Sequence, residues 1–264
     1  MASGPPDYGR LFRLDGRSAV VVGAGSGIGR EAALALAAHG ARVACCDLDQ
    51  EAAEQTAVLA GGQASWEQVD VLSREAVFDL AQRHQGAEIL VFTAGINVRK
   101  PLLDYQDSEF DRVVDLNLRG SFHLIQAFGR VMAEGRRGSI IGISSIRALT
   151  VEPGQGIYAA TKAGLVQLLR TAAAELGTSG VRANAIAPGV VETPLTAQIR
   201  ADPQWYGAYS EKTALRRWAS ASEIAGAVVY LAGDAASYVT GSLLIVDGGW
   251  TAIDGRYDPF ANGR

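Results

Sequence analysis

Three residues in the middle of the chain have side chains suited to proton transfer. Tyr158 and Lys162 lie four residues apart in Gly-Ile-Tyr-Ala-Ala-Thr-Lys, and Ser145 lies thirteen residues before the tyrosine. Positions i and i+4 share one face of a helix, so a phenol and an ammonium would lie side by side. A free tyrosine titrates near pH ~10, and an adjacent cation lowers that pKa. The pair therefore indicates an acid/base group, although Tyr-x-x-x-Lys alone also occurs between ordinary surface neighbours.

A glycine-rich turn near the amino terminus is suited to binding a dinucleotide. An apolar run leads into GAGSGIG at 23–29, and an alanine-rich helical stretch follows. A strand, a glycine turn and a helix in this order point backbone N–H groups and a helix dipole at a diphosphate. The spacing G-x-G-x-x-G fails because its last glycine falls on Ile28, whereas Gly23-x-x-x-Gly27-x-Gly29 fits. A tight turn without a ligand is the alternative interpretation.

Together these motifs resemble the short-chain dehydrogenase/reductase family, from about Leu14 to Gly249. The family's glycine motif is Thr-Gly-x-x-x-Gly-x-Gly, and Val22 stands here in place of the threonine. Its Asn-Asn-Ala-Gly motif reads Phe-Thr-Ala-Gly at 92–95, so both asparagines are missing. Because that loop supports the central sheet, we expect altered local hydrogen bonding rather than lost activity. The stretch 184–193 matches the family's loop on the nicotinamide side.

The resemblance implies a catalytic tetrad of Asn117, Ser145, Tyr158 and Lys162. Tyr158 would exchange a proton with the substrate oxygen while hydride moves between the substrate carbon and the nicotinamide, and Ser145 would hydrogen-bond that oxygen. Lys162 would also bind the nicotinamide ribose, and Asn117 would hold a water that links Lys162 to solvent. Taken singly, Asn117 and Ser145 would be a helix-distorting core amide and a strand-end hydroxyl. The expected reaction interconverts a secondary alcohol and a ketone.

The cofactor is expected to lie across the carboxyl ends of the strands. By resemblance, the residues that would bind it are Gly23, Ser26, Gly27, Ile28, Gly29, Asp47, Asp70, Val71, Ala94, Gly95, Tyr158, Lys162, Pro188, Gly189, Val191 and Thr193. Asp70 and Val71 would flank the adenine, and capping of the next helix is the alternative role of Asp70. Thr193 and backbone groups near Val191 would fix the nicotinamide carboxamide.

Asp47 indicates NAD rather than NADP. It ends the second expected strand, eighteen residues after Gly29, where an acid binds the adenosine ribose hydroxyls and repels a 2′-phosphate. A helix N-cap is the alternative role, but Asp49 is better placed for it. Ser26 leaves its position without the arginine that phosphate-preferring relatives often carry. Arg30 is a counter-argument, although we expect it to be solvated on its helix.

Substrate identity depends on a few polar residues near the expected pocket. Arg147 lies two residues after Ser145, while Asn97 and Arg99 follow the fourth strand. An arginine fork binds both oxygens of a carboxylate, which favours an acidic substrate. Pairing of these arginines with acids of the protein or of a neighbouring subunit is the alternative. The run Ala-Gly-Ile-Asn-Val-Arg-Lys-Pro-Leu-Leu also resembles sugar and sugar-acid dehydrogenases such as gluconate 5-dehydrogenase-like members.

Alternating strand and helix patterns predict one α/β domain with a Rossmann fold. The chain has 264 residues, 48% of them hydrophobic, which suffices for a single large core. The expected strands are 19–23, 42–47, 64–70, 89–94, 139–144, 181–187 and 243–247, and the expected helices are 28–39, 51–60, 74–83, 108–134, 158–176 and 221–232. The resemblance implies a doubly wound, seven-stranded parallel sheet of order 3-2-1-4-5-6-7 with helices on both faces, and usually a homotetramer.

Within the chain we expect a flexible arm at 1–10, the domain at 11–250 and a tail at 251–264. By resemblance, 194–218 is a lid over the substrate, and its aromatic residues either stack on a sugar or pack together. These aromatic residues are Trp205, Tyr206, Tyr209 and Trp218. The tail could lie across a subunit interface or be disordered.

Composition argues against several other classes. The net charge of −4 gives no support for nucleic-acid binding, and three scattered histidines argue against a metal site. Cys45 and Cys46 are adjacent on an expected strand and point to opposite faces, so a disulfide is not expected. The sequence shows no leader and no apolar span for a membrane, and we expect a cytoplasmic protein.

Two other functions remain open from the sequence. One is a 3-oxoacyl thioester reductase of the same family, which would need NADPH and a basic groove for a carrier protein. Asp47 and the acidic net charge argue against it. The other is a catalytically silent NAD-binding regulator, but such proteins typically lose the tyrosine or the lysine, and both are present here.

Overall fold

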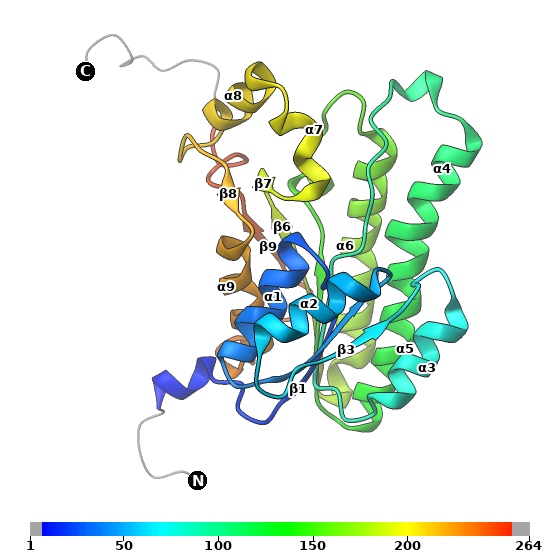
Figure 1. Cartoon of the computed structure of the whole chain (residues 1–264), viewed down its shortest axis with the longest axis vertical. Coiled ribbons are helices and arrows are strands. Elements are labelled where there is room, and N and C mark those ends of the chain that lie inside the picture. Colours follow the sequence, from blue (N-terminus) through cyan, green and yellow to red (C-terminus); the bar gives the residue numbers. More distant parts are fainter. Residues whose placement is uncertain (1–6, 255–264) are drawn as a thin grey trace.

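The computed structural model describes residues 7–254, and a seven-stranded parallel sheet forms its centre (Figure 1). The strand order is β3-β2-β1-β4-β5-β6-β9, which confirms the predicted fold and order. The seven strands are β1 (Ser18–Val22), β2 (Arg42–Asp47), β3 (Ser65–Gln68), β4 (Ile89–Phe92), β5 (Gly138–Ile143), β6 (Val181–Pro188) and β9 (Leu243–Val246). A separate pair, β7 (Val191–Glu192) and β8 (Ala219–Ser220), lies between β6 and β9 in the chain.

Helices cover both faces of the sheet (Figure 1). Helices α1, α2 and α9 pack together on one side, and α3, α4, α5 and α6 pack on the other. The longer helices are α1 (Gly27–Ala38), α2 (Gln50–Ala60), α3 (Arg74–Arg83), α4 (Asp107–Val114), α5 (Gly120–Glu134), α6 (Gly156–Leu176), α8 (Pro203–Lys212) and α9 (Ser222–Ala232). Each side has its own apolar cluster against the sheet.

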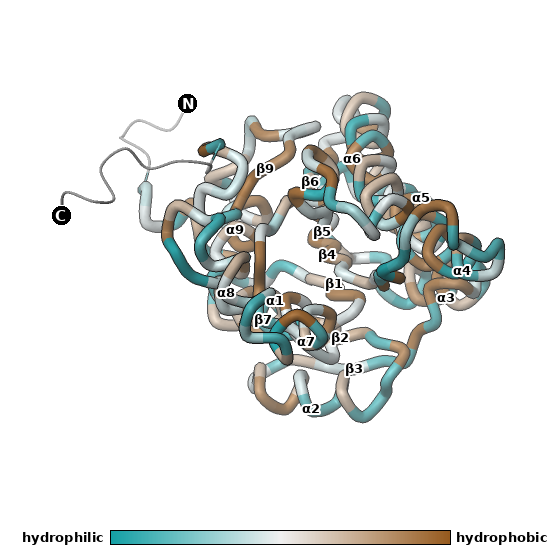
Figure 2. The backbone as a smooth tube through the Cα atoms, turned by 90° about the horizontal axis from the view of Figure 1, so that it is seen from above, coloured by the Kyte–Doolittle hydropathy of each residue, from teal (hydrophilic) through white to brown (hydrophobic). Residues whose placement is uncertain are grey.

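The central strands are apolar on both faces because helices cover both, as the brown strands between the helices show (Figure 2). On β2 the neighbouring side chains alternate between the two clusters: Cys45 belongs to the cluster of α1 and α9, and Cys46 to the cluster of α5 and α6. The prediction that the two cysteines point to opposite faces is therefore confirmed, and both are free thiols.

Two regions differ from the expected elements. The helix expected at 108–134 is divided into α4 and α5 by a π-helical turn at Asp115–Arg119, which contains Asn117. No helix was predicted in the lid segment (194–218), but it contains a 3₁₀ turn at Pro194–Thr196, α7 (Ala197–Arg200) and α8. Figure 1 shows α7 and α8 above the ends of the strands. These helices are short and are stabilised by local caps, such as Asp202 before α8, so they leave little periodic hydrophobic signal in the sequence.

The ends of the chain are described only in part. Tyr8–Phe12 forms a 3₁₀ helix, and the Asp7 side chain accepts a hydrogen bond from Gly9 N at its start. The remainder of the expected arm, 1–6, and most of the expected tail, 255–264, lie outside the described residues. Within residues 7–254, no helix combines the length and apolar character needed to cross a membrane.

Candidate active site

A cavity of about 550 Å³ lies at the carboxyl ends of the central strands. Every residue predicted to bind the cofactor lines this cavity except Gly29. The lining residues therefore come from five places in the chain: the glycine turn, Asp47, the loop after β4, Tyr158 and Lys162 of the tetrad, and the loop after β6. Such a cleft at the carboxyl edge of a doubly wound sheet is where this fold binds dinucleotides.

The glycine turn is shaped by close backbone contacts. Gly23 has a φ of 86°, which favours glycine. A Cβ on Gly29 would lie 1.9 Å from the carbonyl oxygen of Gly23, so this glycine packs the helix start against the turn instead of lining the cavity. Thr93 Oγ1 donates a hydrogen bond to Gly23 O at 3.1 Å. The threonine that replaces a family asparagine thus forms a local hydrogen bond of its own.

Asp47 is held in place at the end of the cavity expected to hold the adenosine. Its Oδ2 accepts a hydrogen bond from Gly25 N at 2.8 Å, and its Oδ1 accepts one from Asp49 N at 3.1 Å. Asp49 caps α2 through Ala52 N, as predicted. Asp47 therefore has backbone partners at both oxygens and still faces the cavity.

Arg30 is not solvated as expected. It is half-buried, and its guanidinium donates to Thr56 Oγ1 at 3.1 Å and to Gly25 O. Among the described residues that line the cavity, Asp47 and Asp70 are the acids and Lys162 is the sole cation. The part of the cavity lined by Asp47 and Asp70 is therefore negative.

The other predicted binding residues have clear local roles. Thr193 lies against the turn, since a Cβ on Gly27 would be 3.2 Å from its Cγ2. Asp70 Oδ1 accepts a hydrogen bond from Leu72 N at 2.9 Å, whereas Ser73 caps α3. The alternative role of Asp70 as the helix cap is therefore wrong.

Tyr158 and Lys162 lie on one face of α6, both buried. Lys162 Nζ donates to Ile143 O at 2.8 Å and lies 5.7 Å from the centre of the Tyr158 ring. Burial lowers the pKa of the Lys162 ammonium to about 8. The predicted pairing of a phenol with an ammonium is thus present in the fold.

The pKa of Tyr158 differs from the expected direction. Burial raises it, while the Ser145 hydrogen bond and the charges of Arg99 and Arg147 lower it less strongly. The expectation that the adjacent lysine lowers this pKa is wrong, because burial of the phenolate outweighs the cations that lower the pKa, Arg99 and Arg147.

Asn117 is a fully buried amide within the π-helical turn. Its Oδ1 accepts from Ile96 N at 2.8 Å, and its Nδ2 donates to Ile96 O at 2.9 Å and to Thr161 Oγ1 at 3.1 Å. These bonds fix the loop after β4 against α6. A Cβ on Gly95 would lie 3.4 Å from Lys162 Nζ, so the loop is held directly beside the lysine.

A smaller pocket of about 70 Å³ adjoins the tetrad. Ser145 and Tyr158 line both this pocket and the larger cavity. The three residues expected near the substrate, Asn97, Arg99 and Arg147, all line the smaller pocket. The lid segment contributes five more lining residues, Leu195, Thr196, Ile199, Tyr209 and Trp218.

The polar contacts of this pocket include two residues that the sequence analysis missed. Glu152 forms an ion pair with Arg147 and lies 3.8 Å from Arg99 Nη1, measured to its Oε1. Gln155 accepts a hydrogen bond from Asn97 Nδ2 at 2.9 Å. Pairing of Arg147 with an acid of the protein itself, the alternative considered above, is therefore correct. Asn97 Oδ1 is buried and has no hydrogen-bond partner within residues 7–254.

The lid aromatics pack on one another. Tyr206 and Trp218 stack with ring centres 4.9 Å apart, and Tyr209 stacks on Trp218 at 5.7 Å. Trp250, which follows β9 in the chain, packs edge-on against Tyr209 with ring centres 5.3 Å apart. These residues form a third apolar cluster with Ile146, Val190 and Ile199.

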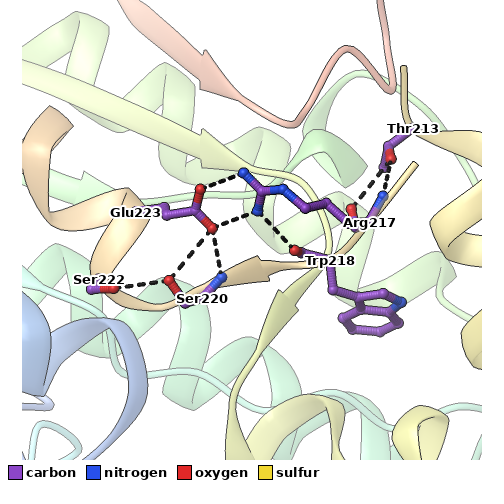
Figure 3. Close-up of polar contacts among 6 residues, drawn as sticks. All are labelled: Thr213, Arg217, Trp218, Ser220, Ser222 and Glu223. Carbon is purple, nitrogen blue, oxygen red and sulfur yellow. Dashed lines mark hydrogen bonds and ion pairs between the residues drawn. The ribbon is translucent and has the colours of Figure 1, made fainter. Parts of the chain in front are cut away.

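The end of the lid segment is anchored to the start of α9 (Figure 3). The Arg217 guanidinium makes two 2.7 Å hydrogen bonds to the Glu223 carboxylate, and Ser220 N donates to the same carboxylate at 2.9 Å. Arg217 and then Ser220 lower the pKa of Glu223 to about 2. Because Trp218 directly follows Arg217, these polar contacts hold the backbone from which the Trp218 ring packs into the apolar cluster.

The histidines have other partners. His39 Nδ1 contacts Ala35 O, His84 pairs with Glu67, and His123 Nδ1 contacts Val71 O. In the described part of the chain, no group of three histidine, cysteine or acidic residues is arranged to hold a metal.

Known proteins resemble the chain along most of its length. A family model described as enoyl-(acyl carrier protein) reductase matches residues 23–251. Galactitol 2-dehydrogenase (L-tagatose-forming) of Cereibacter sphaeroides is 39% identical over 93% of this chain and 99% of the relative. Human (3R)-3-hydroxyacyl-CoA dehydrogenase is 38% identical over 90% of this chain and 96% of the relative.

A solved structure of similar fold has its own ligands. It is a gluconate 5-dehydrogenase from Burkholderia cenocepacia in complex with NADP and tartrate, 33% identical, with a TM-score of 0.89 over 92% of this chain and 98% of that one. Because the family model matches most of the chain and these relatives are more than 30% identical over nearly their whole length, the chain belongs to the short-chain dehydrogenase/reductase family, whose members are nicotinamide-dependent oxidoreductases.

Proposed function

We propose that the protein is an NAD(H)-dependent dehydrogenase that interconverts a secondary alcohol and a ketone on a sugar, a polyol or a sugar acid. The observation that carries this proposal is the position of Ser145 and Tyr158, which line both the cofactor-sized cavity and the polar pocket beside it. A substrate carbon held in the pocket would therefore lie next to a nicotinamide held in the cavity.

The residues have the following proposed roles. The bound cofactor supplies the hydride acceptor. Tyr158 takes the hydroxyl proton of the alcohol or returns it to the forming alkoxide, and Ser145 hydrogen-bonds the same oxygen. Lys162, held by Ile143 O, binds the nicotinamide ribose. Asn117 fixes the loop that carries Gly95 beside Lys162.

The preference for NAD follows from charge. A 2′-phosphate carries up to two negative charges and would lie near Asp47, whereas the one cation among the described lining residues, Lys162, lies beside Tyr158. Leu48, the next residue, is apolar and exposed, and Arg30 already donates to Thr56 and Gly25 O. The NADP in the gluconate 5-dehydrogenase structure argues for the opposite preference, so the cofactor has to be tested directly.

The substrate class follows from the pocket's polar lining. Asn97 Oδ1 offers an unused buried acceptor, and Gln155, Arg99 and Arg147 add further polar groups. Such a lining suits a substrate with several hydroxyl groups. The similarity to galactitol 2-dehydrogenase and to a gluconate 5-dehydrogenase supports this class.

A 3-hydroxyacyl or 3-oxoacyl thioester is the second candidate, favoured by the similarity to human (3R)-3-hydroxyacyl-CoA dehydrogenase. The pocket lining includes the polar side chains of Asn97, Arg99, Arg147 and Gln155, and they suit hydroxyl groups better than an acyl chain, which places this candidate second.

The test is reduction of NAD and of NADP by the purified protein with galactitol, gluconate and 3-hydroxybutyryl-CoA, beside Tyr158→Phe. We expect turnover with NAD on a polyol or sugar acid, lowered by several orders of magnitude in the variant. Turnover of the thioester alone would favour the second candidate. Binding of NAD without turnover of any substrate would favour the silent regulator. Undiminished activity of Tyr158→Phe would contradict the assigned acid/base.

The family resemblance adds two parts to the proposal, a homotetramer and a cytoplasmic location. Sedimentation at micromolar concentration tests the first, and a monomer there would contradict it. Fractionation of the source cells tests the second.

A further inference from the structure

Glu152 receives contacts from four side chains around the substrate-side pocket. Its Oε2 accepts hydrogen bonds from Arg147 Nη2 and Gln155 Nε2, and its Oε1 accepts one from the Tyr209 hydroxyl. Arg99 Nη1 lies 3.8 Å from the same Oε1. One carboxylate thus connects residues that are far apart in the sequence.

The four partners come from four different elements. Arg147 lies in the 3₁₀ turn after β5, Gln155 precedes α6, Arg99 follows β4, and Tyr209 belongs to α8 of the lid segment. All four line the pocket of Ser145 and Tyr158, whereas Glu152 is not among its lining residues. Glu152 therefore lies behind the lining residues and contacts them without lining the pocket itself.

Glu152 also sets the charge of the pocket. Two guanidinium groups and one carboxylate leave a single positive charge. Arg147 is 8% exposed and pairs directly with Glu152. Arg99 makes no hydrogen bond within the described residues; its other contact is the Trp205 ring, 5.1 Å from its guanidinium carbon to the ring centre. Because a buried charge without its partner is costly, Arg147 depends on Glu152 more than Arg99 does.

The lid segment provides a second, matched pair of a tyrosine and a carboxylate. The Tyr206 hydroxyl donates to Glu192 Oε1 at 2.9 Å at an exposed site, while Tyr209 donates to Glu152 in the pocket wall. Both tyrosines stack on Trp218. In both pairs a tyrosine of α8 donates its hydroxyl to a glutamate. The pairs differ because Glu152 also contacts the arginines of the pocket, whereas Glu192 lies at an exposed site.

We propose that Glu152 is a positioning residue, which orders Arg147 and Gln155 around the substrate, joins the lid segment to them through Tyr209, and limits the pocket to one positive charge. This inference rests on the proposed function for its substrate, a polyhydroxy alcohol or acid. Its structural part, the connection between α8 and the pocket wall, can be measured without turnover.

The first test compares Glu152→Gln with Glu192→Gln on gluconate and on the neutral hexitol of equal length, sorbitol. Removing the carboxylate charge leaves two guanidinium groups facing the substrate. We expect the ratio of kcat/KM for gluconate over sorbitol to rise about tenfold in Glu152→Gln, the size of one charged hydrogen bond, with the KM for NAD unchanged. Glu192→Gln should leave the ratio as in the wild type. Equal loss on both substrates in Glu152→Gln would overturn the assigned effect on charge.

The second test is limited proteolysis with trypsin in the presence of NADH. The lid segment contains four cleavage sites, Arg200, Lys212, Arg216 and Arg217. We expect Tyr209→Phe and Glu152→Gln to be cleaved there several-fold faster than the wild type, with unchanged cleavage elsewhere, whereas Tyr206→Phe should match the wild type.

Equal cleavage of Tyr209→Phe and Tyr206→Phe would overturn the connection between the lid and the pocket. If Glu152→Gln does not fold, the comparison of the two tyrosine variants still decides this point. If the wild type oxidises neither gluconate nor sorbitol, the proposed function fails for these substrates, but the proteolysis still tests Glu152.

Discussion

Replacing Asp47 with asparagine removes one negative charge from the adenosine end of the cavity and keeps the shape of the side chain. In the wild type, both carboxylate oxygens accept backbone hydrogen bonds, from Gly25 N and Asp49 N. The side-chain oxygen of an asparagine can accept one of these hydrogen bonds, but its NH₂ group then faces the other backbone N–H, which loses its acceptor. Part of the effect of Asp47→Asn is therefore a loss common to NAD and NADP, and the ratio of the two cofactors is the informative quantity.

The magnitude follows from Coulomb's law. Asp47 is half-exposed, so the effective dielectric constant lies between the bulk-water value and about 20. A carboxylate about 6 Å from a phosphate charge then contributes about 1–2 kcal/mol of repulsion, which corresponds to about 5- to 30-fold in affinity. We expect the ratio of kcat/KM for NAD over NADP to fall by that factor in Asp47→Asn, chiefly through a lower KM for NADP.

Asp49→Asn is the matched control, since it removes the same charge two residues away. Asp49 caps α2 through Ala52 N, and asparagine caps helices as well as aspartate does, so its stability and cofactor ratio should stay near those of the wild type. Steady-state kinetics with both cofactors at fixed ionic strength gives the two ratios. A shift in Asp47→Asn no larger than that in Asp49→Asn would refute a specific role for Asp47 in cofactor choice.

Two other predictions concern stability and can be read from thermal unfolding. Burial lowers the pKa of Lys162 from 10.5 to about 8, so the unfolded chain binds more protons between these pH values and this group costs up to about 3 kcal/mol at neutral pH. The wild type should therefore gain stability between pH 7 and pH 10, whereas Lys162→Met should not. We expect the difference in Tm, variant minus wild type, to become more negative over this range, and a constant difference would contradict this. Gly29→Ala should lower Tm and cofactor affinity because its Cβ would meet Gly23 O at 1.9 Å, while Gly226→Ala, exposed and unobstructed on α9, should raise stability by about 0.5–1 kcal/mol. Equal effects of the two glycine variants would contradict the close packing at the turn.

The sequence predicted those parts of the molecule that local patterns determine. Apolar runs marked the central strands because both faces of the sheet are covered, and Asp49 was recognised as a cap from its place before a helix. A helix-distorting core amide was the alternative role considered for Asn117, and the π-helical turn contains this residue. The partner of its side chain was not predicted, because Ile96 lies twenty-one residues away in the sequence. The pairing of Arg147 with Glu152 involves neighbours in the sequence, yet its significance depends on Tyr209, which only the fold brings near.

The charges of the substrate pocket and the acid/base group are connected. Arg99 and Arg147 both lower the pKa of Tyr158 against the larger effect of burial. Glu152 offsets part of their charge, and an anionic substrate bound at Arg99 would offset more of it. Because a weaker positive field disfavours the phenolate, such a substrate would keep Tyr158 protonated to a higher pH than a neutral polyol would. Protonated Tyr158 serves ketone reduction, and ionised Tyr158 serves alcohol oxidation. If the proposed function holds, the two arginines expected to select the substrate therefore also influence at which pH each direction of the reaction is fastest.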